Sequence, residues 1–177
     1  GVAMGGMMIW LFVSLGIGMR TSTQTISSRR YGEKDFDKCG LALRHGLIIA
    51  FVIGLPLSIL GFFFFGDVIP HLLTHGSIIP YTSIYVQYMS LGILVTLCVL
   101  VFQGFYNSIE MTKIHMQATI ISNIINIYLN AGLIFGTDKI NDFFSDSPFY
   151  MLKYLWAWTD FPALGVKGAA LGTVFAT

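Results

Sequence analysis

Long apolar runs separated by shorter polar stretches dominate this chain. Four of them cover Gly1–Met19, Leu47–Phe65, Pro80–Tyr106 and Ile114–Gly136, and a fifth begins near Leu164. A helix needs about 20 mainly apolar residues to cross the hydrocarbon core of a bilayer, and these runs reach or approach that length. They lack the strict alternation of apolar and polar residues that is typical of a membrane barrel strand. The pattern therefore predicts an all-α, polytopic transmembrane helical bundle.

The runs and the polar stretches between them define the expected elements. We expect one partial transmembrane unit over residues 1–177, with helices over residues 1–24, 40–65, 80–106, 113–136 and 164–177. Residues 137–163 are crowded with aromatic side chains, which suits a segment lying at the level of the lipid headgroups. A lid over a substrate site is the alternative interpretation of this outer segment.

The basic residues indicate the orientation of the bundle. The first connection holds six of them: Arg20, Arg29, Arg30, Lys34, Lys38 and Arg44. The second connection, residues 66–79, contains no Lys or Arg. Since Lys and Arg favour cytoplasmic loops, the first connection is expected inside and the second outside.

Composition narrows the possible functions. Hydrophobic residues make up 55% of the chain and charged residues 11%, with a formal net charge of +1. A charge this small gives no basic field for nucleic acid. The sequence also lacks the GxxxxGK[ST] phosphate-binding loop, so we expect no ATP hydrolysis by this segment. Cys39 and Cys98 are interpreted as packing residues, and His71 and His75 as residues of a solvated outer loop rather than metal ligands.

A polar stripe marks the fourth predicted helix. Thr119, Asn123, Asn126 and Asn130 follow one another at steps of four, three and four residues, which places them on one helix face. Carboxamides are disfavoured in hydrocarbon unless they face protein or a wet cavity, so this face is expected to point into the bundle. Binding of a substrate or ion, and hydrogen bonding between helices, both explain such a stripe.

Two further patterns carry weaker information. Tyr85 and Tyr88 of the third predicted helix could hold an organic cation by cation–π attraction, or could belong to an aromatic belt like Tyr81. Gly168 and Gly172 form a GxxxG pair, which allows close packing of two helix backbones.

Four segments, taken in order, resemble the multidrug and toxic compound extrusion (MATE) family. They resemble the end of its second helix with the following loop, the end of its fourth helix, its fifth helix, and the start of its sixth. These segments are Gly16–Asp35, Phe102–Phe105, Asn126–Gly136 and Leu164–Thr173. The chain begins and stops inside apolar runs, so we expect a fragment of the amino-terminal lobe.

The resemblance implies a twelve-helix, two-lobe transporter, of which this chain would supply helices two to five and part of six. It implies a monomeric antiporter in the plasma membrane, in bacteria the inner membrane, and not an enzyme. Such a protein exports amphipathic, often cationic, organic compounds in exchange for protons or sodium ions. Its implied partners are the organic substrate and the bilayer, and it uses no cofactor besides the coupling ion.

The resemblance also implies a polar site. In many family members an Asp on helix one, an Asn and an Asp four apart on helix five, and a Thr on helix six form it. Asn126 matches the Asn and Thr173 the Thr, whereas Asn130 stands where the Asp is often found. Asn130 cannot titrate, but its oxygen can still bind sodium or a substrate. We therefore expect Asn126, Asn130 and Thr173 to be ligands. The candidates for lining the cavity are Tyr85, Tyr88, Gln103 and Asn123.

Two other functions fit the same helices. A lipid-linked oligosaccharide flippase of the same superfamily would more often line its cavity with Arg and Lys to meet pyrophosphate, and the cores of these runs contain none. A membrane scaffold without transport activity would use the Asn stripe only to hold helices together.

Overall fold

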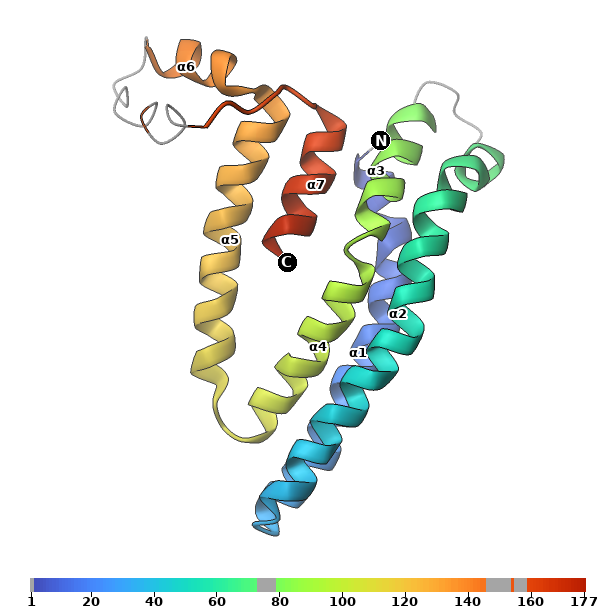
Figure 1. Ribbon diagram of the computed structural model, residues 1–177, viewed down its shortest axis with the longest axis vertical. Helices are drawn as coiled ribbons and strands as arrows, with labels where there is room; N and C mark the ends of the chain where they lie inside the picture. Colours follow the sequence, from blue (N-terminus) through green and yellow to red (C-terminus); the bar gives the residue numbers. More distant parts are fainter. Residues whose placement is uncertain (1, 73–78, 146–153, 155–158) are drawn as a thin grey trace.

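The computed structural model describes residues 2–72, 79–145, 154 and 159–177, and within them the chain is all-α (Figure 1). Seven helices occupy these described residues. They are α1 (Val2–Gly32), α2 (Phe36–Leu72), α3 (Ile79–Ser90), α4 (Ile93–Ser108), α5 (Thr112–Phe135), α6 (Thr137–Ser145) and α7 (Val166–Ala176). No β-strand occurs in this described part of the chain.

The first connection is mostly helical. α1 has 31 residues and α2 has 37, which at 1.5 Å per residue gives lengths of roughly 47 and 56 Å. Both are longer than the hydrocarbon thickness of about 30 Å. Only Glu33–Asp35 form the turn between them. The sequence predicts that the helices end near the ends of the apolar runs. Arg, Lys and Gln are good helix formers, so both helices continue through the polar residues as well.

The helix expected over residues 80–106 is two helices. α3 and α4 meet at a bend of 53°, with Leu91 and Gly92 forming the turn between them. The break leaves backbone groups of α4 without a partner in their own helix. The Leu94 N–H donates instead to Ser58 Oγ of α2, at 3.1 Å, so the neighbouring helix compensates for the break.

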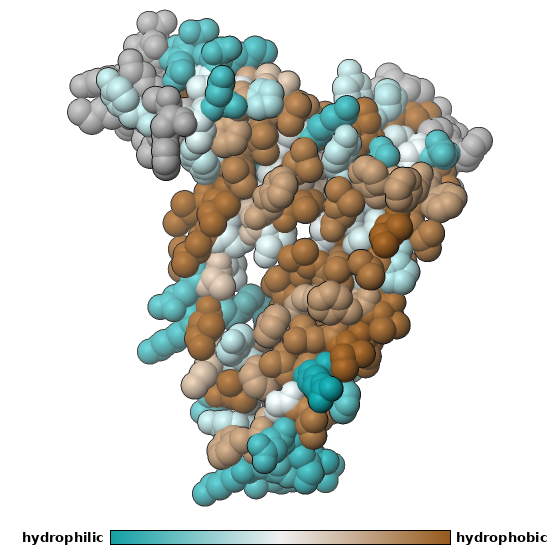
Figure 2. Space-filling model, viewed as in Figure 1, coloured by the Kyte–Doolittle hydropathy of each residue, from teal (hydrophilic) through white to brown (hydrophobic). Residues whose placement is uncertain are grey.

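Length and composition identify α2 and α5 as helices that could cross a membrane, and α3 with α4 as a third span if the bent pair is taken together. This finding applies to the described residues only. Figure 2 shows mainly apolar surface over the middle of the bundle, with hydrophilic residues gathered at the tip of α1 and α2 and around α6. His71 belongs to the end of α2 rather than to a loop, and His75 lies outside the described residues.

The helices form two groups joined by α7. α1, α2 and α4 run side by side, while α5 turns away from the lower end of α4 (Figure 1). α7 lies between α5 and α3, and α6 lies across the upper end of α5. α6 begins the expected interfacial segment, most of whose remainder, residues 146–153 and 155–158, lies outside the described part.

The packing of the first group depends on small residues. Ala50, Ile93, Leu97 and Val101 form a buried cluster between α2 and α4. Gly104 of α4 lies so close to α1 that a Cβ there would collide with the backbone carbonyl of Arg20. Because a backbone carbonyl cannot rotate aside as a side chain can, Gly104 fixes how closely α1 and α4 approach.

Gly104→Ala should therefore destabilise the bundle by about 1–3 kcal/mol, the usual cost of overpacking. Thermal unfolding of the full-length protein in detergent measures this. Gly40→Ala is the matched control, since a Cβ at Gly40 meets nothing within 4 Å. Alanine favours helix over glycine, so the control should keep or raise the melting temperature. Equal melting temperatures for the two variants would contradict the assigned contact.

Candidate functional site

Three contacts fix α7 against α5 in antiparallel register. A Cβ on Gly168 would collide with the Leu133 carbonyl, and a Cβ on Gly172 would collide with the side chain of Asn130. Further along, Ser122 Oγ donates a hydrogen bond to the Ala176 carbonyl. The GxxxG pair predicted from sequence is thus the surface of α7 that meets α5, and it brings α7 directly onto the Asn stripe.

The stripe forms an amide pair where α7 covers it. Asn130 Nδ2 donates to Asn126 Oδ1 at 2.8 Å, and both residues are half-buried. Asn130 Oδ1 is fully buried and accepts no hydrogen bond within the described residues. An unsatisfied buried acceptor destabilises the folded state by about 1–3 kcal/mol. A ligand that binds this oxygen would offset that penalty.

Thr173 follows directly after the glycine that meets Asn130. It is half-buried, and its Oγ1 donates to the Ala169 carbonyl of its own helix at 2.9 Å. This bond uses the hydroxyl hydrogen and leaves the oxygen able to accept a hydrogen bond or bind a cation. Among the described contacts, none joins Thr173 directly to Asn126 or Asn130, so the structure brings together the two amides and Gly172 but does not join Thr173 to them.

The other half of the polar stripe is exposed in this chain. Thr119 and Asn123 are exposed, and Thr119 Oγ1 donates back to the His115 carbonyl. Within this chain α7 leaves these two residues uncovered, so the expectation that Asn123 lines a cavity stays a prediction. The reason is helix geometry: Ser122, one position from Asn123, is the residue that meets the end of α7.

The other expected cavity residues occupy different environments. Tyr85 is buried in α3, whereas Gln103 is half-buried in α4. Tyr88 packs edge-on against Phe62, with ring centroids 5.9 Å apart, and Lys167 Nζ lies 5.9 Å from the Tyr88 ring centroid. The Lys167 contact links α7 to α3 and was not predicted. Its only sequence signal is a single charge at the start of an apolar helix.

A small cavity lies where α7 approaches the break between α3 and α4. Its volume is about 20 Å³, enough for about one water molecule. Thr96 and Thr177 supply polar side chains to an otherwise apolar lining that includes Gly92 and Val174. Sequence analysis missed this cavity because it depends on the bend in a segment that the hydropathy pattern presents as one helix.

The arrangement suits recognition rather than bond-breaking chemistry. Amide and hydroxyl oxygens are neutral ligands for a hard cation or a hydrogen-bonding substrate, and they cannot exchange a proton near neutral pH. No group of three or more His, Cys, Asp or Glu residues that could hold a metal ion occurs in the described part of the chain.

Gly172→Ala should disrupt this site, because the added methyl group would occupy the position of the Asn130 amide. We expect a loss of about 1–3 kcal/mol in stability from overpacking. In an Asn130→Ala background the same change should cost clearly less, since the colliding amide is gone. A double-mutant cycle by thermal unfolding measures the difference. Strictly additive effects would show that Gly172 and Asn130 do not contact one another.

Comparison with known proteins places this geometry in a family. No curated protein matches the chain. One similar solved structure is described as the inward-facing conformation of a multidrug resistance MATE family transporter of the MOP superfamily. It matches with a TM-score of 0.69 and 18% identity, over 93% of this chain and 32% of that chain. At this identity the match shows the fold, and the chain spans about a third of that protein.

The MatE family model matches residues 1–131, which confirms the resemblance seen in the sequence: the chain belongs to the MatE family.

Proposed function

We propose that the protein containing this chain is a secondary active antiporter. It exports amphipathic, often cationic, organic compounds across the plasma membrane, in bacteria the inner membrane, in exchange for sodium ions or protons. Membership of the MatE family supports a transporter, and the similar solved structure is described as a multidrug resistance transporter. The local chemistry of α5 and α7 supports the assignment of the site.

The observation that carries the proposal is the Asn126–Asn130 pair. Hydrogen bonding between helices explains a polar stripe when every polar atom finds a partner in the neighbouring helix. Here the amides bond to each other within α5, and Asn130 Oδ1 is left without a hydrogen-bond partner among the described residues. A pair that only held helices together would gain more by bonding across to α7.

The same chemistry favours sodium over protons at this position. A bare amide oxygen is a good ligand for a hard cation, but Asn126 and Asn130 cannot take up a proton. Thr173, the residue after Gly172, offers a second neutral oxygen on α7. Proton coupling would require a carboxylate from another part of the protein. The proposal is therefore that α5 and α7 hold sodium or a polar group of the substrate.

The contacts of α7 suit alternating access, in which helix groups rock about a site near the middle of the bilayer. α7 meets α5 through glycines, whereas its Lys167 lies over the Tyr88 ring of α3 and its Val174 lies against Gly92 in the break between α3 and α4. Close backbone contacts move as a unit, and contacts between side chains separate at lower cost. We expect α5 and α7 to move together relative to α3.

Transport by the full-length protein in liposomes tests the proposal. With an imposed sodium gradient, Asn126→Ala and Asn130→Ala should each lower cation export about tenfold or more, as expected for the loss of one ion–dipole ligand. Ile127→Ala is the control, because Ile127 lies on the same helix and is 69% exposed. If both Asn variants export normally and keep their ion coupling, the site is wrong. If a proton gradient alone drives export in the wild type, sodium coupling is wrong.

Asn130→Asp should make the site sensitive to pH. An aspartate at this half-buried position has a pKa of its own and can take up a proton, which the wild-type amide cannot do. Above that pKa the variant should bind sodium more tightly than the wild type, and below it the advantage should disappear as the carboxyl takes up a proton. Sodium-dependent export measured from pH 5 to pH 8 checks this. A flat difference between variant and wild type across this range would contradict the site.

A further inference from the structure

A second cavity, unrelated to the amide pair, lies along the seam between α1 and α2. Its volume is about 580 Å³, and it is open to the outside. On α1 it extends from Arg30 near the turn to Gly18, and on α2 from Lys38 to Ile53. Twelve residues separate Gly18 from Arg30, so the groove is about 18 Å long at 1.5 Å per residue. One leaflet of a bilayer has a hydrocarbon thickness of about 15 Å, half of the roughly 30 Å core.

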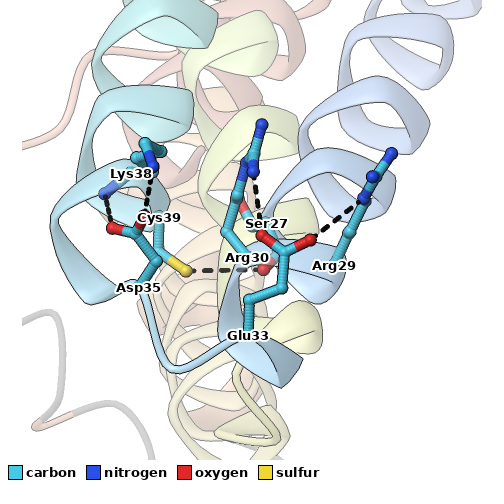
Figure 3. A network of polar contacts seen from close by, with 7 residues as sticks. All are labelled: Ser27, Arg29, Arg30, Glu33, Asp35, Lys38 and Cys39. Atoms are coloured by element: carbon cyan, nitrogen blue, oxygen red, sulfur yellow. Dashed lines mark hydrogen bonds and ion pairs between the residues drawn. The ribbon is translucent and has the colours of Figure 1, made fainter.

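The groove is basic at one end. Arg30 and Lys38 line it near the turn, and His45 lies about two helical turns beyond Lys38 along α2. Figure 3 shows how Arg30 and Lys38 are held: Arg30 Nη1 pairs with Glu33 at 2.8 Å, and Lys38 Nζ pairs with Asp35. Both carboxylates have a lowered pKa, mainly through hydrogen bonds from Arg30 to Glu33 and from Lys38 to Asp35, so they stay ionised.

These ion pairs orient the basic groups and still leave some of their N–H donors available to a ligand. A guanidinium has five N–H donors and an ammonium three, so each can bind a phosphate as well as its carboxylate. The side chain of Lys38 is 56% exposed and that of Arg30 36%. Counting the whole turn, Arg29, Arg30, Lys34 and Lys38 exceed Glu33, Asp35 and Asp37 by one positive charge.

Apolar side chains form the walls of the rest of the groove, and contact between α1 and α2 closes its floor. Ile26 of α1 and Leu41, Ile49 and Ile53 of α2 line it, and all four are more than a third exposed. Gly46 meets the side chain of Thr23 at the floor, so the two helices are in contact beneath the groove. A cationic entrance leading to an apolar channel of one leaflet's depth matches the shape and polarity of a phospholipid.

From these features we infer that the α1–α2 groove binds an anionic phospholipid of the cytoplasmic leaflet. Its phosphate lies between Arg30 and Lys38, and one acyl chain lies along Ile26, Ile49 and Ile53 toward Gly18. The inner leaflet is the anionic one, and the basic turn is expected on that side. Phospholipid binding is independent of the proposed transport activity and of the site between α5 and α7.

Native mass spectrometry of the full-length protein in detergent tests this inference. The probes are phosphatidylglycerol and phosphatidylcholine with the same acyl chains. We expect the wild type to retain phosphatidylglycerol in preference to phosphatidylcholine. Arg30→Gln with Lys38→Gln should weaken phosphatidylglycerol binding about tenfold, since each basic residue near the surface contributes about 1 kcal/mol. Arg29→Gln with Lys34→Gln removes the same charge from the same turn outside the groove, and should change binding little.

A groove-filling variant tests the apolar part separately. A Cβ on Gly18 meets nothing within 4 Å, so Gly18→Phe can place its ring in the groove without a backbone collision. It should abolish the retention of phosphatidylglycerol while leaving the melting temperature of the delipidated protein unchanged. Gly6→Phe is the control on the same helix, because Gly6 also meets open space and does not line the groove.

Three results would overturn the inference. Equal weakening by the two charge-removal pairs would mean unspecific attraction to the basic turn. Normal phosphatidylglycerol binding by Gly18→Phe would place the lipid elsewhere. Absence of bound lipid in the wild type, together with a lowered melting temperature for Gly18→Phe, would mean that another segment of the protein fills the groove.

Discussion

The close approach of α7 to α5 is the contact on which the candidate site depends. Gly168 and Gly172 have no side chains, so the α7 backbone can lie against the Leu133 carbonyl and the Asn130 amide. A membrane offers no hydrophobic drive for helices to associate, and packing this close supplies the attraction instead. The same contact buries Asn130 Oδ1 away from any hydrogen-bond partner among the described residues. Packing and binding chemistry therefore share one surface.

Much of the fold could be predicted from the sequence, because hydrophobic length and the absence of charge are sufficient to indicate helices in a membrane. The pattern could not predict how helices end. The polar residues around Arg29 and Lys38 look like a loop in a hydropathy profile, yet they belong to α1 and α2. Nor could it predict the bend at Gly92, because the apolar run continues through the break and the Leu94 N–H finds its partner, Ser58, on another helix.

The site was predictable to a similar degree. Helical spacing placed Asn126 and Asn130 on one face, and the GxxxG pair indicated close helix packing. Which part of the stripe α7 covers depends on helix register, and that cannot be read from spacing within one helix. Asn123 and Thr119 were therefore included although they are exposed. The α1–α2 groove was missed for the same reason: a groove between two helices depends on how their side chains pack against each other, which the sequence of each helix alone does not show.

Accessibility of the amide face to water tests the central claim most directly. In a full-length protein without native cysteines, a thiol at position 126 is compared with one at position 127 by labelling with a charged, water-soluble methanethiosulfonate. Asn126→Cys should react several-fold faster than Ile127→Cys if the amide face lines a hydrated site, since Ile127 points away from the amide pair, is 69% exposed, and a thiol surrounded by hydrocarbon stays unreactive. Sodium should slow the reaction at position 126 alone. Equal rates at both positions, unaffected by sodium, would contradict a hydrated binding site on α5.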